Sequence, residues 1–264
     1  MGARSNHVEA GAAVPRYREL APLYDRLIGD TLFPAIRTSF ESCRRTLGIR
    51  FSAAADIGCG SGRFLHHLSR YRIPLFGVDA SPEMLRVAAR RLGPDKAVLL
   101  CQDMRRFRLP KSVDLITCNG DTLNYLLSRE DLHHTLLCCG EQLNPGGYLI
   151  GDFLCGTPVA PAGEVRQQVV RLPGVVSKWQ WRAAPYGRIT EVGIQFIFRT
   201  PLGKRKSRET HRQRWYTEHE FLRQLSAAGL RDCRIWPMPV PGGAGPGGRW
   251  LKFLARRLPE ATLH

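Results

Sequence analysis

Short apolar runs alternate with helix-like stretches along the first 155 residues of the chain. The apolar runs predict strands, and the stretches between them predict helices, one of which begins with the capping pair Ser81 and Pro82. The predicted strands are residues 53–57, 75–78, 97–101, 113–118 and 148–153. Strands that alternate with helices favour an α/β fold with a parallel sheet.

The pattern changes to an alternation of apolar and polar residues after position 156. A period of two predicts antiparallel strands, here a β insert. The alternating segments are residues 175–183, 188–200 and 209–216. A helix capped by Thr217 follows, and then two last strands at about 231–236 and 249–256. We expect a Rossmann-like, seven-stranded, mostly parallel sheet with helices on both faces and the insert as a lid above its carboxyl edge.

Length and composition predict one domain with a disordered start. A chain of 264 residues with 43% hydrophobic residues can bury a substantial core, and residues 1–15 are small, polar and aperiodic. The expected domain is 16–264. Its parts are N-terminal helices (16–50), a half with a glycine-rich loop (51–155), the insert (156–216), and the last helix and strands (217–264).

The glycine-rich loop reads A-A-A-D-I-G-C-G-S-G over residues 53–62 and connects a predicted strand to a predicted helix. Glycines at Gly58, Gly60 and Gly62 allow a positive φ and let a ligand lie against bare backbone. A glycine motif alone is weak, since most such loops are turns without a ligand. The loop nevertheless marks one edge of the sheet as the candidate binding edge.

Three carboxylates follow three successive predicted strands. Asp56, Asp79 and Asp103 therefore reach the same edge of one parallel sheet. An acidic group at the end of the second strand, the position of Asp79, can accept both ribose hydroxyls of a nucleoside.

These motifs resemble those of class I S-adenosylmethionine-dependent methyltransferases, in particular small-molecule N-methyltransferases. The resemblance covers about residues 20–155 and is carried by D-I-G-C-G-S-G-R-F (56–64), G-V-D-A-S-P-E-M-L (77–85), C-Q-D-M-R-R-F (101–107) and L-N-P-G-G-Y-L-I (143–150). Arg63 stands where a dinucleotide-binding loop has its third glycine. The spacing favours the methyl donor over NAD.

The resemblance implies S-adenosylmethionine as the cofactor. Asp79 would hold the ribose and Asp103 the adenine amino group, while Tyr24 would close over the donor. The glycine-rich loop, Asp56 and Asn119 would hold the methionine part. The expected donor-binding residues are Tyr24, Asp56, Gly58, Cys59, Gly60, Gly62, Asp79, Ala80, Met84, Asp103, Met104 and Asn119.

The acceptor side is less defined by the sequence. Asp121, His211 and Tyr216 are candidate catalytic residues, although Asp121 is equally read as a helix cap and His211 as a structural histidine. The expected substrate-binding residues are Asp121, Asn124, Tyr125, Trp179, Trp181 and Tyr216. Methyl transfer needs mainly orientation, so no catalytic triad or metal cluster is required.

The chain is strongly basic, with a net charge of +16 from 39 basic and 23 acidic residues. Only six basic residues are lysines, and the densest cluster is K-R-K-S-R at 204–208. Basic charge favours polyanionic partners, which leaves an RNA methyltransferase as an alternative beside a non-catalytic, donor-binding regulatory subunit. We expect a small-molecule substrate instead, with no nucleic acid, no metal, no membrane, a cytoplasmic location and a homodimer as an open possibility.

Overall fold

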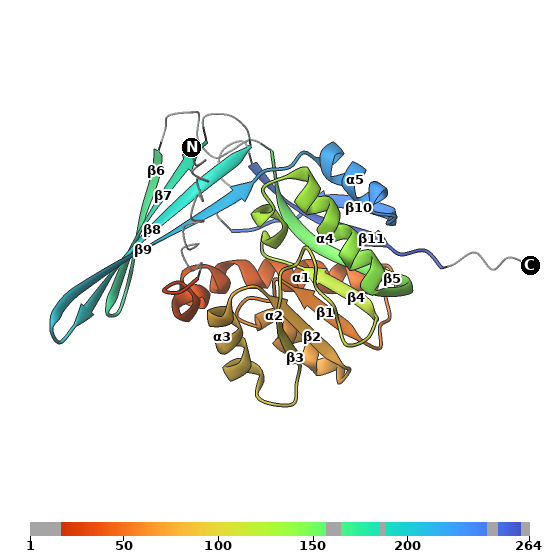
Figure 1. Ribbon diagram of the computed structural model, residues 1–264, viewed down its shortest axis with the longest axis horizontal. Coiled ribbons are helices and arrows are strands. Elements are labelled where there is room, and N and C mark those ends of the chain that lie inside the picture. The colour runs from red at the N-terminus through yellow and green to blue at the C-terminus, as the bar shows by residue number, and fades with distance from the viewer. Residues whose placement is uncertain (1–16, 157–164, 185–187, 242–247, 260–264) are drawn as a thin grey trace, which may run out of the picture.

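The computed structural model describes residues 17–156, 165–184, 188–241 and 248–259. The segment expected to be disordered, 1–15, lies outside these ranges. The described chain forms a seven-stranded main sheet in the order β10-β11-β5-β4-β1-β2-β3 (Figure 1). Its strands are β1 (Ala54–Ile57), β2 (Leu75–Asp79), β3 (Val98–Cys101), β4 (Val113–Cys118), β5 (Leu143–Gly156), β10 (Arg231–Pro237) and β11 (Gly248–Arg256).

Strand direction in the main sheet confirms the expected Rossmann-like α/β fold. β1, β2, β3, β4 and β5 pair in parallel, whereas β11 pairs antiparallel with both β5 and β10. The register sets Asp56 beside Gly77 on one side and Thr117 on the other. The loops after β1, β2 and β4 therefore start at one edge of the sheet.

Helices cover both faces of the main sheet. They are α1 (Asp30–Thr46), α2 (Arg63–Leu68), α3 (Pro82–Leu92), α4 (Arg129–Gln142) and α5 (Glu218–Ala227). Three helices begin at a hydroxyl that accepts a backbone N–H, namely that of Ser81, Ser128 or Thr217. Each such cap contributes about 1 kcal/mol.

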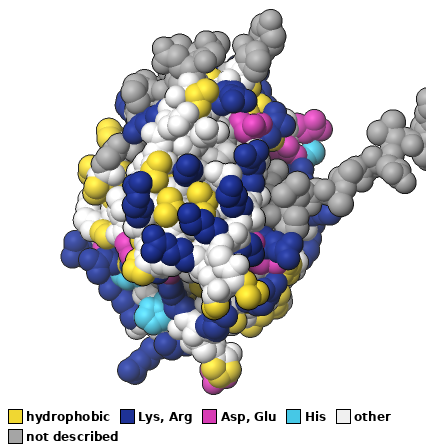
Figure 2. Space-filling view, turned by 90° about the vertical axis from the view of Figure 1, so that its left-hand side faces the viewer, with side chains coloured by type: hydrophobic (Ala, Val, Ile, Leu, Met, Phe, Trp, Pro, Cys, Tyr) yellow, Lys and Arg dark blue, Asp and Glu magenta, His cyan; other side chains and the backbone are white. Residues whose placement is uncertain are grey.

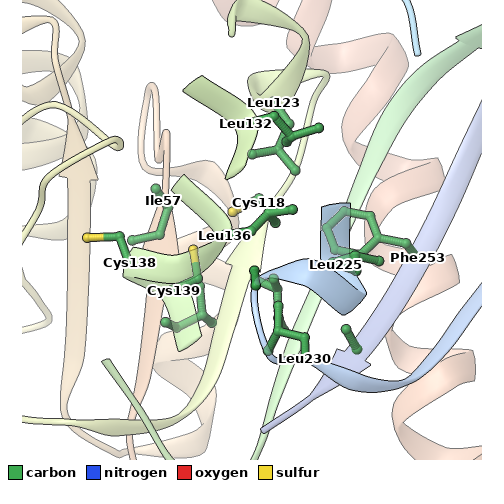
Figure 3. Close-up of a cluster of buried hydrophobic side chains, with 14 of the residues drawn as sticks. Ile57, Cys118, Leu123, Leu132, Leu136, Cys138, Cys139, Leu225, Leu230 and Phe253 are labelled. Carbon is green, nitrogen blue, oxygen red and sulfur yellow. The ribbon is translucent and has the colours of Figure 1, made fainter. Parts of the chain in front are cut away.

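The core has two layers, one on each face of the main sheet. On one face, α4 and α5 pack on residues such as Ile57, Cys118 and Phe253 (Figure 3). On the other, α1, α2 and α3 pack around Phe40 and Leu65. The cysteines are free thiols.

The insert forms a separate four-stranded antiparallel sheet, called here the insert sheet. Its strands are β6 (Val165–Leu172), β7 (Val175–Ala183), β8 (Ile189–Thr200) and β9 (Gly203–Arg214), paired in that order. Figure 1 shows it extending away from the main sheet. The sequence did not predict β6, because most of its residues are exposed and it shows no clear alternation.

The chain returns from the insert sheet to the main sheet close to the point where it left the main sheet. Cys155, near the end of β5, forms a single parallel β-bridge with Tyr216. The backbone N–H of Gly156 donates to the carbonyl of Tyr216 at 3.1 Å. The two ends of the insert are thus neighbours.

The N-terminal segment packs against one face of the insert sheet. Leu20 is buried there with Trp179 and Phe196. The expected regular helix from residue 16 is instead a turn, a 3₁₀ helix at Ala21–Leu23 and a π-helix at Asp25–Gly29. Pro22 interrupts the segment and has no N–H to give. In the described part of the chain, no helix combines the length and apolarity needed to cross a bilayer.

Candidate active site

The glycine-rich loop follows β1 directly and is fastened to β2. The backbone N–H groups of Gly58 and Cys59 donate to the carbonyl of Val78 at 2.7 and 3.0 Å. All three loop glycines have positive φ. A Cβ at Gly58 would lie 2.2 Å from Thr122, whereas at Gly60 the nearest atom would be 3.9 Å away. Gly60 is therefore the position where a ligand can lie against bare backbone.

Asp79 links this loop to the start of α3. One carboxylate oxygen accepts from the N–H of Gly60 at 2.9 Å and the other from that of Ser81 at 2.8 Å. Burial raises the pKa of Asp79, and the two N–H donors oppose this shift. Ala80 beside it is exposed, so the edge is open to a ligand here.

Asp103 and the two methionines lie further along the same edge. Asp103 is bound by the guanidinium of Arg105, whose Nε donates to Oδ1 at 3.0 Å, and this hydrogen bond lowers the pKa of the carboxyl. Met84 on α3 is buried and Met104 is partly buried. A ligand amino group would have to share Asp103 with Arg105.

A buried lysine lies at the carboxyl ends of the central strands. Lys252 on β11 is opposite Asp152 on β5, and neither side chain is accessible to solvent. The Lys252 Nζ donates to Asn119 Oδ1 at 2.8 Å and lies 3.9 Å from Asp152 Oδ2. Two atoms of this group, Asn119 Nδ2 and Asp152 Oδ2, have no hydrogen-bond partner among the described residues.

Burial shifts the pKa values of this cluster toward the neutral forms. It lowers the pKa of Lys252, although Asp152 opposes that shift, and it raises the pKa of Asp152. Burial also raises the pKa of Asp56 to about 7, against a hydrogen bond from Thr117 Oγ1 at 2.6 Å. The edge is thus a low-dielectric site with more carboxyl groups than cations.

Asp121 lies beside this cluster, in the loop after β4. Its φ is 51°, in the left-handed region, and its N–H donates to Asp152 Oδ1 at 2.9 Å. Gln213 on the insert sheet donates to its carboxylate at 2.6 Å. Burial, with a contribution from Asp152, raises the pKa of Asp121 to about 8.

A chain of hydrogen bonds joins three segments beside Asp121. The hydroxyl of Tyr17 donates to that of Tyr125 at 2.6 Å, and the Tyr125 hydroxyl lies 3.3 Å from His211 Nδ1. His211 Nε2 lies 3.3 Å from Glu209 Oε2. Glu209 Oε1 in turn accepts from the backbone N–H groups of Glu19 and Leu20. The N-terminal segment is therefore held to β9.

The N-terminal segment is also held to the glycine-rich loop. Asp25 accepts from Ser61 Oγ at 2.8 Å and pairs with Arg91 of α3. Tyr24 precedes it, and burial raises the pKa of its hydroxyl. This arrangement places the Tyr24 hydroxyl close to Gly120, where an added Cβ would lie 3.8 Å from it.

Four of the expected substrate-binding residues contact other residues of the protein: Asn124 and Tyr216 in the core, and Trp179 and Trp181 on the insert sheet. Asn124 Nδ2 donates to the carbonyl of Leu154 at 3.0 Å. The Tyr216 hydroxyl donates to the backbone carbonyl of Leu126. Both side chains lie in the core rather than at an open surface. The rings of Trp179 and Trp181 share a face of the insert sheet, as expected, and stack with centroids 5.8 Å apart.

Sequence reasoning missed the residues that hold this site together. Lys252 and Asp152 each stand within an apolar strand, a position where an ionisable residue is a signal of a buried pair. Asp25, Glu209 and Gln213 gave no such signal, because their partners are distant in the sequence.

The residues at this edge fit S-adenosylmethionine. Gly60 offers bare backbone, and Asp79 offers a carboxylate beside the exposed Ala80. The buried Nδ2 of Asn119, which has no partner among the described residues, is a hydrogen-bond donor available to a ligand.

Comparisons with known proteins agree with this geometry. Residues 54–147 match a family described as a methyltransferase domain. The chain is 29% identical over 201 residues to a dTDP-3-amino-3,4,6-trideoxy-alpha-D-glucopyranose N,N-dimethyltransferase of Streptomyces venezuelae, covering 76% of this chain and 81% of that protein. It is also 29% identical over 210 residues to a dTDP-4-amino-2,3,4,6-tetradeoxy-D-glucose N,N-dimethyltransferase of Saccharopolyspora spinosa, covering 74% and 75%.

Solved structures show the same fold. DesVI of Streptomyces venezuelae superposes with a TM-score of 0.71 at 26% identity, over 91% of this chain and 98% of that one. An S-adenosylmethionine-dependent methyltransferase of Clostridium acetobutylicum gives a TM-score of 0.76 at 22% identity, over 92% and 99%. The proposed donor edge consists of the glycine-rich loop, Asp79 and Asn119. The strand order, the matched domain and the proposed donor edge together support a class I S-adenosylmethionine-dependent methyltransferase.

Proposed function

We propose that the enzyme methylates the amine of a small-molecule acceptor, of the nucleotide-linked amino sugar class. The activities of its relatives support this class, since they are N,N-dimethyltransferases of dTDP-linked amino sugars. The observation that carries the proposal is the buried Asp121 carboxyl, which accepts from Gln213 of the insert sheet at 2.6 Å. In its carboxylate form this group can attract a cationic amine and accept a proton from it.

Bound S-adenosylmethionine supplies a methyl group that is already activated on a sulfonium. The protein then has to hold donor and acceptor in line, and orientation alone is worth roughly 7–11 kcal/mol. Gly60, Asp79 and Asn119 would fix the donor. Tyr24 and the underside of the insert sheet would exclude water and fix the acceptor.

Asp121 would also manage the proton of the acceptor. A protonated amine has no lone pair and cannot attack, so it must lose a proton in the site. The carboxylate form of Asp121, which becomes the main form as the pH rises through about 8, attracts the ammonium group and then accepts its proton. His211 stays a second candidate, because its Nδ1 faces Tyr125.

The two alternative functions find less support. An RNA methyltransferase rests on the net charge of +16 alone. A regulatory subunit does not agree with an enzyme family and a complete donor edge. A cytoplasmic location and a homodimer stay predictions of the sequence.

The direct test is incubation of the enzyme with methyl-labelled S-adenosylmethionine and a panel of acceptors. The panel pairs dTDP-linked 3-amino and 4-amino sugars with their hydroxyl analogues, and adds bulk RNA. We expect mass increases of one or two methyl groups on an amino sugar and none on its hydroxyl analogue. Label in RNA, or equal methylation of the hydroxyl analogue, would contradict the proposal.

A further inference from the structure

The insert sheet has two faces of different chemistry. Its strand register places the aromatic side chains of the sheet on the inner face, toward the N-terminal segment. The outer face carries nine cations and one acid, Glu191, among its described residues. One of the cations, Arg214, is half-buried at the end of β9 and pairs with Glu220 at 3.0 Å. The other eight are exposed: Arg171, Lys178, Arg182, Arg199, Lys204, Lys206, Arg208 and Arg212. Three of the six lysines of the chain are thus on this face.

These eight outer cations are exposed and have no acidic partner. None of the eight forms an ion pair with another described residue. The neighbouring Arg205 shows the contrast, because it points to the inner face, pairs with Glu19 at 2.7 Å and lies over Phe198. Figure 2, viewed from the side on which the insert sheet lies in Figure 1, shows Lys and Arg side chains gathered around a few hydrophobic ones. Concentrated charge on one face favours an anionic partner.

Apolar residues on the outer face and in the turn at its tip indicate what kind of anionic partner binds there. Leu202, in the turn between β8 and β9, is fully exposed at 101%, and cations at Arg199 and Lys204 flank the turn. Val165 and Val169 on β6 are exposed at 38% and 44%. An exposed leucine between cations is typical of a segment that enters the boundary between lipid headgroups and acyl chains.

Nucleic acid fits this face less well. Binding of single strands uses aromatic rings on which bases stack, and the outer face has none among its described residues. A protein-sized acidic partner would not explain the exposed leucine at the tip. Charge complementarity and the apolar tip together favour an anionic bilayer.

We propose that the outer face of the insert sheet docks on an anionic lipid surface, with Leu202 entering the headgroup region. The inner face, with Gln213 and His211, still covers the acceptor side of the active site. Docking is therefore compatible with turnover and does not depend on which acceptor is methylated.

The test measures sedimentation of the full-length protein with vesicles of phosphatidylcholine, with or without phosphatidylglycerol. We expect binding only to the anionic vesicles, weakened by salt. Replacing the four exposed outer cations of β9 by serine should lower the partition coefficient at least about tenfold. These cations are Lys204, Lys206, Arg208 and Arg212. Leu202→Ser should lower it roughly threefold.

Matched control variants separate docking from net charge. One control replaces four exposed cations of the main domain by serine: Arg50, Lys96, Lys111 and Arg223. The other is Leu258→Ser, at a leucine that is 45% exposed. Both controls should bind anionic vesicles nearly as wild type does, and all variants should keep S-adenosylhomocysteine binding.

Three outcomes would overturn the proposal. They are no binding to anionic vesicles at low salt, an equal loss in the charge control, and binding to RNA with a steep salt dependence in the absence of vesicle binding. Methylation of the acceptor panel is measured separately, so a failed vesicle test leaves the proposed function untouched.

Discussion

The proposed donor edge and the proposed acceptor side of this enzyme are built in different ways. The first is the glycine-rich loop with Asp79, and the second is Asp121 with the residues of the insert sheet that cover it. The donor edge rests on backbone groups close in sequence: Gly60 donates to Asp79, 19 positions away. The acceptor side rests on side chains from distant segments, such as Gln213 and Asp121, which are 92 positions apart. Donor binding therefore needs only the strand–loop–helix units, whereas the acceptor side needs the register of the insert sheet. The donor edge can therefore be predicted from the order of residues in the chain, whereas the acceptor side can be found only in the folded structure.

Lys252 and Asp152, at the boundary between the two regions, provide the strongest test of this comparison. In Lys252→Met, Asp152 would stay buried without its cation and Asn119 would lose its partner, which should lower the free energy of unfolding by about 3–5 kcal/mol. Urea denaturation measures this. The double variant Lys252→Met/Asp152→Asn should recover part of the loss, because the uncompensated charge is gone. A single variant as stable as wild type would mean that the pair is no part of the framework.

Asp79→Ala tests the donor edge alone. It removes a carboxylate that also holds two backbone N–H groups, so the affinity for S-adenosylhomocysteine should fall about tenfold or more. Calorimetry measures the affinity, and Asp95→Ala at an exposed position is the control. Unchanged affinity would show that the edge does not hold the ribose there.

Asp121→Asn tests the acceptor side through pH. Because the raised pKa of Asp121 keeps it protonated below about pH 8, the base form and the turnover of wild type should increase as the pH rises through 8. The variant keeps the shape but cannot accept the proton, so it should lose about tenfold in rate at high pH and lose this limb of the profile. The variant His211→Gln serves as comparison. If it removes the limb and Asp121→Asn does not, the base is His211.

Trp181→Ala should have the smallest effect. The ring stacks on Trp179 on the inner face of the insert sheet, so its loss should raise the KM for the acceptor several-fold. Donor affinity should change less than threefold, since Trp181 lies on the insert sheet whereas Gly60 and Asp79 contact each other at the main sheet. Steady-state kinetics measure the KM for the acceptor, and calorimetry measures the affinity for the donor. A collapse of donor affinity would mean that the two regions are not separate.

The sequence predicted the fold well because each unit carries its own signals. Ser81 and Thr217 cap their helices as expected, and the apolar runs became strands of the main sheet. β6 was missed because six of its eight residues are exposed and its apolar residues do not alternate regularly. The turn that joins it to β7 contains Gly174, whose φ is 80°.

The candidate site was predictable only in part. Asp79 and the glycines lie where strand ends must lie, but their roles, like those of Asp103 and Asn119, stay predictions. Patterns gave Asp121 and His211 as separate residues and could not give the contact of Asp121 with Gln213 or that of His211 with Tyr125. Tyr216 follows a polar segment in the sequence, yet its hydroxyl donates to the carbonyl of Leu126 in the core. Its ring packs against Phe221 of α5, a contact that the sequence pattern does not show.

The junction at Gly156 and Tyr216 has an evolutionary consequence. Because the insert leaves and rejoins the core at two residues that are hydrogen-bonded to each other, its strands can lengthen, shorten or be exchanged without displacing the strands that carry the donor edge. An insert attached in this way would let related enzymes differ in the acceptors that they methylate while they keep the same methyl donor. A chimaera that takes its insert from a relative, joined at these two residues, would inherit substrate preference from one parent and stability from the other.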